Sequence, residues 1–263
     1  MWTRRWLSSS AACPPGPWSR SPERVLGMSG ATPRYVLKPD PHSSHSIILR
    51  WLGEGHGRRL LDVGAADALL SRQLTERRWR VTAIEGDPAL AQAGAPHCER
   101  MITANLDRDI PLLEGSFDAI VYADVLEHLA DPLRVLSELD RYLAPDGFVI
   151  VSVPNIAHLY IRLLLLFGRF DYIDRGILDR THLRFFTARS LRAFMADAGL
   201  VVERLTATPA PLYQVLPKSW HKRWVGATHA INAVVARNLP RLLGYQLIVL
   251  GRPKGGAPGA SDG

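Results

Sequence analysis

The sequence predicts an α/β fold with a doubly wound, seven-stranded sheet and a small cap. From residue 60 onward, short apolar runs alternate with helical patterns, as repeated βαβ units require. The length of 263 residues, with 47% hydrophobic residues, suits one large domain with a sizeable core. No stretch of about 18 uncharged apolar residues occurs, which argues against a membrane-spanning helix.

The strands are expected at the short apolar runs, and the helices between them. Asp131 and Pro132 predict a helix start, because Asp caps free N–H groups and Pro suits the first helical position. Other helices are expected over 66–74 and 187–198, the second ending at Gly199. The expected strands are 60–63, 80–84, 101–104, 117–122, 148–153, 200–205 and 246–250.

The net charge of +7 is concentrated near the two ends of the chain. Residues 1–30 carry +3 and residues 208–263 carry +6, so the middle carries −2. Nucleic-acid binding is therefore not expected, since the basic charge lies outside the working part and no nucleic-acid-binding motif occurs. We expect a disordered leader over 1–30, one domain over 31–253 with a cap insert at about 209–242, and a disordered tail over 254–263.

The composition of the leader leaves its role open. It is rich in Arg and Ser and poor in acids, which would also fit an organelle transit peptide, and translation starting at Met28 is a further alternative. Two cysteines, Cys13 and Cys98, cannot build a disulfide framework. They favour a reducing compartment, and hence a cytoplasmic protein.

The turn after the first strand points to a nucleoside-containing cofactor. It lies where ligands of doubly wound sheets bind, and Glu85 ends the next strand, where a carboxylate can accept hydrogen bonds from ribose hydroxyls. A dinucleotide would need three glycines, but this turn has only Gly64. The Asp67 carboxylate would repel a diphosphate and tolerate a sulfonium. The turn therefore favours S-adenosylmethionine over NAD.

Four motifs in this order resemble the class I S-adenosylmethionine-dependent methyltransferases, over about residues 35–253. They are the segments 60–64 (LLDVG), 83–88 (AIEGDP), 117–129 (FDAIVYADVLEHL) and 143–147 (LAPDG). The resemblance implies a Rossmann-like fold and methyl transfer. Two more segments, 152–158 and 176–187, resemble a bacterial subgroup associated with saccharide or cell-envelope synthesis and the methyltransferase-like proteins of methionine biosynthesis.

The same resemblance implies which residues hold the cofactor. Family members usually have glycines at Ala66 and Ala68, and a turn with alanines survives if its backbone is helical there. We therefore expect a weaker or slightly shifted site. Asn105 stands where an Asp commonly receives the adenine amino group, and Tyr122 and Ala123 would line the methionine end. The full expected set is Asp62, Gly64, Ala65, Ala66, Asp67, Glu85, Gly86, Asn105, Leu106, Tyr122 and Ala123.

Histidines near the fourth strand are the candidate catalytic groups. Asp124, Glu127 and His128 share one face of a helix start opposite the cofactor turn, and His128 is the first choice for a general base. His182 is the alternative base, and a structural role for either histidine is the competing explanation. Asp179 is expected to pair with Arg180 or Arg184. No histidine pair has metal-ligand spacing, so no metal is predicted.

The expected reaction is methylation of a small-molecule or saccharide acceptor, most naturally at oxygen. The rival hypothesis is a non-catalytic module that binds the cofactor or a partner, and a dehydrogenase is a distant third. Residues 159–167 are apolar nearly all round, which predicts a core helix, with an acceptor-side wall or a membrane-surface contact as the alternatives. A basic aromatic cluster could contact a membrane surface or an anionic ligand; it comprises Lys218, Trp220, Lys222, Arg223 and Trp224.

Overall fold

The computed structural model describes residues 40–211 and 223–254, with side chains in the second range from Thr228 onward. These residues all fall in one of the two units of the chain, Leu37–Gly263. The expected leader and nearly all of the expected tail lie outside the described residues. Of the basic aromatic cluster, Lys218, Trp220 and Lys222 also lie outside them, and only the backbone of Arg223 and Trp224 is described.

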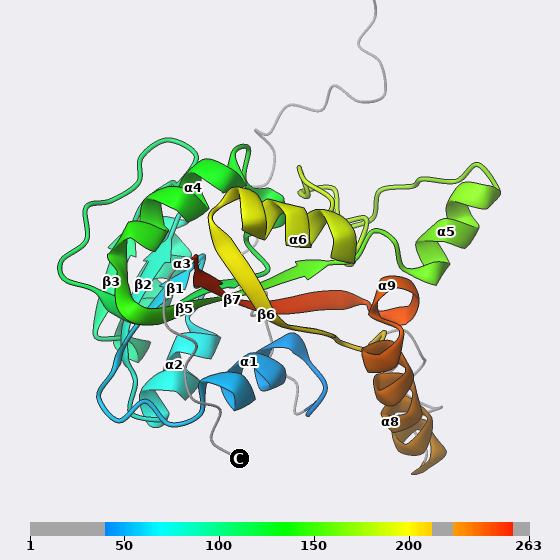
Figure 1. The fold of residues 1–263 in the computed structure, drawn as a ribbon, viewed down its shortest axis with the longest axis horizontal. Coiled ribbons are helices and arrows are strands. Elements are labelled where there is room, and N and C mark those ends of the chain that lie inside the picture. Colours follow the sequence, from blue (N-terminus) through cyan, green and yellow to red (C-terminus); the bar gives the residue numbers. More distant parts are fainter. Residues whose placement is uncertain (1–39, 212–222, 255–263) are drawn as a thin grey trace, which may run out of the picture. The chain divides into compact units, whose positions relative to one another are not determined.

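A single mixed sheet contains all seven predicted strands, in the order β3-β2-β1-β4-β5-β7-β6 (Figure 1). The first five strands pair in parallel, and β7 runs antiparallel to both β5 and β6. The chain order reverses between β1 and β4, so ligands are expected at the carboxyl ends of these strands. The strands are β1 (Arg59–Val63), β2 (Arg80–Glu85), β3 (Arg100–Thr103), β4 (Phe117–Ala123), β5 (Leu143–Pro154), β6 (Leu200–Ala207) and β7 (Gln246–Pro253).

Helices cover both faces of the sheet, which confirms the predicted doubly wound architecture. One apolar cluster joins α1 (Ser44–Leu52) and α2 (Leu69–Glu76) to the sheet, and a second joins α4 (Pro132–Leu139) and α6 (Ala188–Asp197) to the other face. α3 (Pro88–Gly94) connects β2 to β3. Asp131 caps α4 by accepting a hydrogen bond from the Arg134 N–H, as the sequence predicts.

Three further helices lie beyond the end of the sheet where β5 ends and β7 begins (Figure 1). They are α5 (Leu159–Leu166), α8 (Arg223–Asn238) and α9 (Pro240–Leu243). The last two form the described part of the expected insert between β6 and β7. The buried Asn155 side chain donates to the carbonyls of Pro240 and Gly244, which fastens the end of β5 to this insert.

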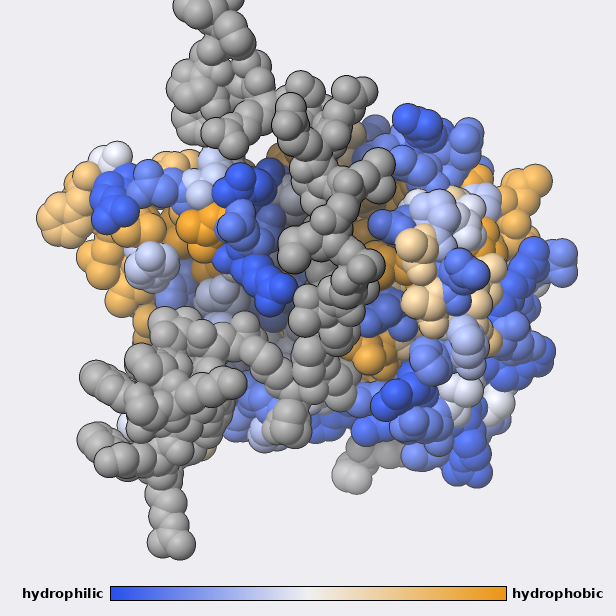
Figure 2. All heavy atoms as spheres, turned by 180° about the vertical axis from the view of Figure 1, so that it is seen from behind, coloured by the Kyte–Doolittle hydropathy of each residue, from blue (hydrophilic) through white to orange (hydrophobic). Residues whose placement is uncertain are grey.

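The prediction that residues 159–167 form a core helix is wrong. Within α5 only Ile161 is buried, whereas Leu166 and Phe167 at its end are 76% and 77% exposed. Figure 2 shows the resulting hydrophobic patch at the left edge of the molecule. Between residues 40 and 254, outside the 212–222 gap, the structure contains no helix long and apolar enough to cross a membrane.

Two element boundaries also differ from the prediction. β5 begins at Leu143 and not at 148, because Leu143 pairs with Phe117 across an irregularity in the β4 ladder. α1 was not predicted as a helix; it begins because the Ser43 hydroxyl accepts a hydrogen bond from the Ser46 N–H. This helix carries His45, which lies near Asp124 and Asp67.

We expect stability to depend on pH through Asp140, next to the core. Burial raises the pKa of Asp140 to about 7, while the Tyr122 hydroxyl bonded to one carboxylate oxygen opposes the rise. Because the folded pKa exceeds the unfolded one, the free energy of unfolding falls as pH rises from about 4 to about 7. Asp140→Asn should remove this dependence. Its free energy of unfolding, relative to that of the wild type, should therefore increase by about 2 kcal/mol when the pH is raised from 5 to 8.

Urea unfolding at both pH values measures this effect. Asp146→Asn, at an exposed position, is the matched control and should shift the two unfolding curves equally. A pH-independent difference between Asp140→Asn and the wild type would contradict the assignment.

Candidate active site

The turn between β1 and α2 requires a glycine at its first position. Gly64 has a φ of 72°, and a Cβ there would lie 2.5 Å from the Val125 Cγ2 atom. The N–H groups of Gly64 and Ala65 both donate to the Ile84 carbonyl, which fixes the turn against β2. The turn therefore lies directly against the segment that follows β4, where the candidate catalytic residues are.

Glu85, at the end of β2, is positioned to hold a ribose. One carboxylate oxygen accepts the Ala66 N–H at 2.7 Å, and the other accepts the Asp87 N–H at 2.8 Å. Each oxygen keeps lone-pair capacity, so the carboxylate can still accept from two vicinal hydroxyls. A Cβ at Gly86 would make only ordinary van der Waals contact with the Ala104 carbonyl, at 3.6 Å, so this position does not itself require a glycine. These features fit an adenosyl group.

Asp62 and Tyr122 do not present their side chains as the resemblance implied. Asp62 is 2% exposed and accepts a hydrogen bond from the Ser71 hydroxyl at 2.6 Å, so it braces α2 from below the turn. Burial raises its pKa to about 6, with a smaller contribution from Glu85. Tyr122 is fully buried in the core, with its hydroxyl directed at Asp140. Only the Tyr122 backbone can line a ligand site, beside the half-buried Ala123.

The expectation that Ala66 and Ala68 are helical is wrong. Their φ angles are 50° and 58°, both in the left-handed region, and α2 consequently begins at Leu69. This conformation costs an alanine roughly 1 to 2 kcal/mol. Ala68 is buried, and its methyl packs where Gly94 leaves space. Ala66 is half-buried, so its methyl contributes less packing.

Ala66→Gly is expected to stabilise the protein by about 0.5 to 1 kcal/mol, because relief of the strained φ exceeds the added flexibility of the unfolded chain. Chemical denaturation measures the gain. Ala68→Gly is the control: it relieves the same strain but loses a buried methyl, so it should gain little or lose stability. Equal gains from both variants would contradict this explanation.

The remaining predicted cofactor residues are close in sequence to these strand ends. Asn105 is exposed just beyond β3, and its side-chain oxygen accepts the Asp107 N–H at 3.1 Å. Its Nδ2 group, a donor, is the other hydrogen-bonding group it can offer to an adenine ring. Leu106 is 6% exposed and belongs to the core, whereas Asp67 is half-buried in the turn.

Asp124, directly after β4, adopts a strained backbone. Its φ is 55°, and its two carboxylate oxygens accept from the Ser152 hydroxyl at 2.6 Å and from the Gln246 amide at 2.8 Å. Strained residues of this kind are held by their surroundings and are frequent at functional sites. The two bonds hold the Asp124 side chain toward β5 and β7, which gives it a bracing role at these strand ends.

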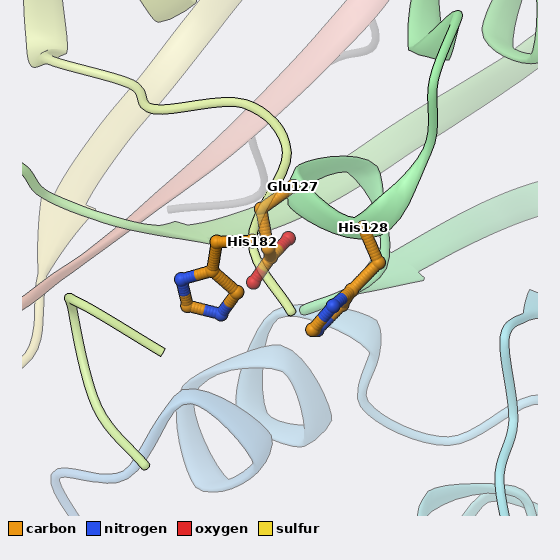
Figure 3. A group of neighbouring side chains, drawn as sticks. All are labelled: Glu127, His128 and His182. Atoms are coloured by element: carbon orange, nitrogen blue, oxygen red, sulfur yellow. The ribbon is translucent and has the colours of Figure 1, made fainter. Parts of the chain in front are cut away.

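His128 and His182, the two candidate bases, lie side by side with Glu127 (Figure 3). Glu127 and His128 belong to the short helix η2 (Leu126–His128), and the ring centroids of the histidines are 4.9 Å apart. Burial lowers the pKa of His182. Burial and the nearby Asp124 hold the pKa of Glu127 well above its usual range. The sequence placed Glu127 on the same face as His128 but gave it no catalytic role.

The loop that carries His182 is fastened to η2 by its backbone. The N–H groups of Leu183 and Arg184 both donate to the Glu127 carbonyl, at 2.7 and 3.0 Å. The predicted pairing of Asp179 with an arginine is wrong, because Asp179 accepts from the backbone and hydroxyl of Thr181. Arg180 instead pairs with Asp174 at 2.7 Å.

His45, on α1, also approaches this region. Burial lowers its pKa, while the nearby Asp124 and Asp67 raise it. The N-capping Ser43 is the sequence signal that could have located the helix. His158 has a structural role, since its Nδ1 atom accepts the Tyr160 N–H at the start of α5.

The cavity at the opposite edge of the sheet is not this site. It has a volume of about 480 Å³ and lies at the amino ends of β1 to β4. Arg80 in its lining pairs with Glu99 at 2.6 Å, and Arg100 pairs with Glu114 at 3.7 Å. Two of its three arginines are thus paired with carboxylates of the protein, and the cavity lies away from the strand ends where the cofactor turn is.

Comparison with known proteins relates this chain to methyltransferases. Residues 39–205 match the family model described as a methyltransferase domain. The ubiquinone biosynthesis O-methyltransferase of Pseudomonas paraeruginosa is 30% identical over 62% of this chain and 74% of its own length. The protein of the same name from a Caulobacter species is 27% identical over 72% of this chain and 85% of its own length.

Two solved structures share the fold. Magnesium protoporphyrin IX methyltransferase from Synechocystis, solved with bound S-adenosylhomocysteine, has a TM-score of 0.55 and 16% identity, covering 80% of this chain and 82% of that one. An S-adenosylmethionine-dependent methyltransferase from Mesorhizobium loti has a TM-score of 0.54 and 15% identity, covering 80% and 98%. This chain belongs to the class I S-adenosylmethionine-dependent methyltransferases.

Proposed function

We propose that this enzyme methylates a hydroxyl oxygen on a small molecule. The observation that carries the proposal is the position of His128 and His182, on segments fastened together beside Val125, which itself lies against the cofactor turn at Gly64. A hydroxyl acceptor keeps its proton at neutral pH, so its methylation benefits from a nearby group that accepts it. Imidazole is well suited to this role near neutral pH.

S-adenosylmethionine, when bound, supplies the methyl group on a positively charged sulfur. The protein's own contribution is then alignment of the acceptor with the methyl group and removal of the hydroxyl proton. Glu85 would hold the ribose and Gly64 would let the backbone approach the ligand. His128, or His182 as the alternative, would take the proton at Nε2, because each Nδ1 atom faces a backbone carbonyl.

An apolar acceptor that bears a hydroxyl suits the surroundings better than a saccharide. Ile161 of α5 packs against Ile177 and Leu178, which precede His182 in the same loop. The apolar helix thus borders the segment that carries a candidate base. The relatives' names specify O-methylation in ubiquinone biosynthesis, which favours oxygen as the acceptor atom here.

The experiment is to incubate the purified chain with S-adenosylmethionine and matched acceptors, and to measure formation of S-adenosylhomocysteine. We expect turnover with an alkyl-substituted catechol, and little with its fully O-methylated analogue or with a saccharide. Turnover of amine or thiol acceptors alone would contradict O-methylation. Tight binding of S-adenosylhomocysteine without turnover of any acceptor would favour the rival, a non-catalytic binding module.

A further inference from the structure

Glu127, His128 and His182 form a compact cluster of side chains that can bind a metal. Each offers one potential ligand atom, and these atoms all lie within 4.8 Å of one another. Figure 3 shows the carboxylate between the two imidazole rings. The backbone bonds from Leu183 and Arg184 to the Glu127 carbonyl hold both segments together. The cluster is therefore largely preformed.

Both imidazoles are oriented as metal ligands usually are. The Nδ1 atom of His128 lies 3.2 Å from the Thr181 carbonyl, and that of His182 lies 3.1 Å from the Ile177 carbonyl. A carbonyl can only accept, so each Nδ1 donates its proton and the Nε2 of the neutral ring carries the free lone pair. Such a bond from the second ring nitrogen to a backbone carbonyl is the usual support of a metal-binding histidine.

Glu127 lacks the compensation that a buried carboxylate needs. It is 1% exposed, and in the part of the chain that the structure describes neither carboxylate oxygen has a hydrogen-bond partner. The nearby arginines are engaged elsewhere, Arg180 with Asp174 and Arg184 with the Ala130 carbonyl. An uncompensated buried carboxylate costs several kcal/mol, and a bound cation would remove that cost.

We propose that Glu127, His128 and His182 bind a divalent transition-metal ion, with zinc the best match to the donor set. Two imidazoles and one glutamate are a ligand set of catalytic zinc sites, which keep one position open. Ligand atoms around zinc lie about 3.3 Å apart, so the longest separation must close by up to about 1.5 Å. Rotation of the three side chains can supply this movement.

The open coordination position gives the ion a role in the proposed methyl transfer. This catalytic role rests on the proposed function, whereas the binding of the ion does not. A hydroxyl coordinated there loses its proton to solvent water more readily. Its oxygen then bonds to the methyl carbon as the sulfur–methyl bond breaks, and the bonding electron pair stays on sulfur to give S-adenosylhomocysteine. With an ion bound, the two histidines hold the metal and do not themselves take the proton.

Equilibrium dialysis of the chelator-treated full chain against Zn²⁺, followed by elemental analysis, tests the site directly. We expect one Zn²⁺ per chain. His128→Ala and His182→Ala should each weaken binding at least about tenfold. The visible absorption of the Co²⁺-loaded wild type should be that of a four-coordinate site, a readout that needs no variant. Circular dichroism checks that each variant folds.

His158→Ala and Cys98→Ser are the matched controls and should bind Zn²⁺ as the wild type does. The absence of stoichiometric binding, or binding unchanged in both cluster variants, would overturn the site. The metal is measured without cofactor or acceptor, so the two proposals fail separately. A chain that binds zinc but methylates no hydroxyl contradicts only the proposed function, whereas one that methylates a hydroxyl without binding zinc contradicts only the metal site.

Discussion

Glu85→Ala is expected to weaken the binding of S-adenosylmethionine and S-adenosylhomocysteine by at least about 100-fold. Two hydrogen bonds from ribose hydroxyls to a carboxylate contribute about 3 kcal/mol together, which corresponds to that factor. The substitution also leaves the Ala66 and Asp87 N–H groups without their acceptor, so the turn loses a brace on the ligand side. Isothermal titration calorimetry with S-adenosylhomocysteine measures the loss.

Glu76→Ala is the control for this experiment. Glu76 lies at the exposed end of α2 and pairs only weakly with Arg72, at 3.5 Å. Its replacement should leave the affinity within about twofold of the wild type, because exposed ion pairs contribute little. NAD should bind neither the wild type nor the two variants, since the turn lacks two of the three glycines that a dinucleotide needs. A loss below tenfold in Glu85→Ala would remove the ribose assignment.

The sequence predicted the sheet well because buried parallel strands have a strong local signature. The side chains of β1 after Arg59 are all buried, whereas the edge strands β3 and β6 are only partly buried. The start of α4 was predictable for the same reason, since Asp131 and Pro132 act on their immediate neighbours. The positions of Gly64 and Glu85 followed from these strands.

What the sequence did not predict depends on contacts between distant segments. The left-handed φ of Ala66 is fixed by its bond to Glu85, on another strand, and not by alanine's own preference. His182 reaches His128 across more than fifty residues through backbone bonds that no local pattern encodes. For that reason a search for short histidine spacings predicted no metal, although three potential ligands meet in the fold.

The burial of the apolar helix α5 could not be predicted from its composition. Its composition matches that of a core helix, yet it lies beyond the end of the sheet, where few elements remain to cover it. Apolar composition therefore predicted the helix but not its burial. The contact of its buried Ile161 with Ile177 and Leu178, in the loop of His182, is what favours an apolar acceptor over the saccharide that the subgroup resemblance suggested.

Replacement of both His128 and His182 with alanine is expected to lower kcat at least about 100-fold while leaving the affinity for S-adenosylhomocysteine within a few fold. Proton removal by a positioned group contributes about 10² to 10⁴ to such a rate, and in both imidazoles the contact of Nδ1 with a backbone carbonyl leaves Nε2 available. The proposed cofactor contacts, which centre on Glu85 and Gly64, are untouched by these substitutions. Steady-state assays and calorimetry on the same protein separate the two effects.

The two single variants, with His158→Ala as a control, show how much of kcat depends on each of the two histidines. If one imidazole alone takes the proton, its single variant should show nearly the whole loss of kcat seen in the double variant, and the other single variant much less. If both histidines hold one ion, each single variant should show most of that loss, because the effects of groups that act as a unit are not additive. His158→Ala, which removes only the cap of α5, should keep kcat within about twofold. A double variant that loses less than tenfold would mean that alignment of acceptor and methyl group, and not these histidines, supplies the catalysis.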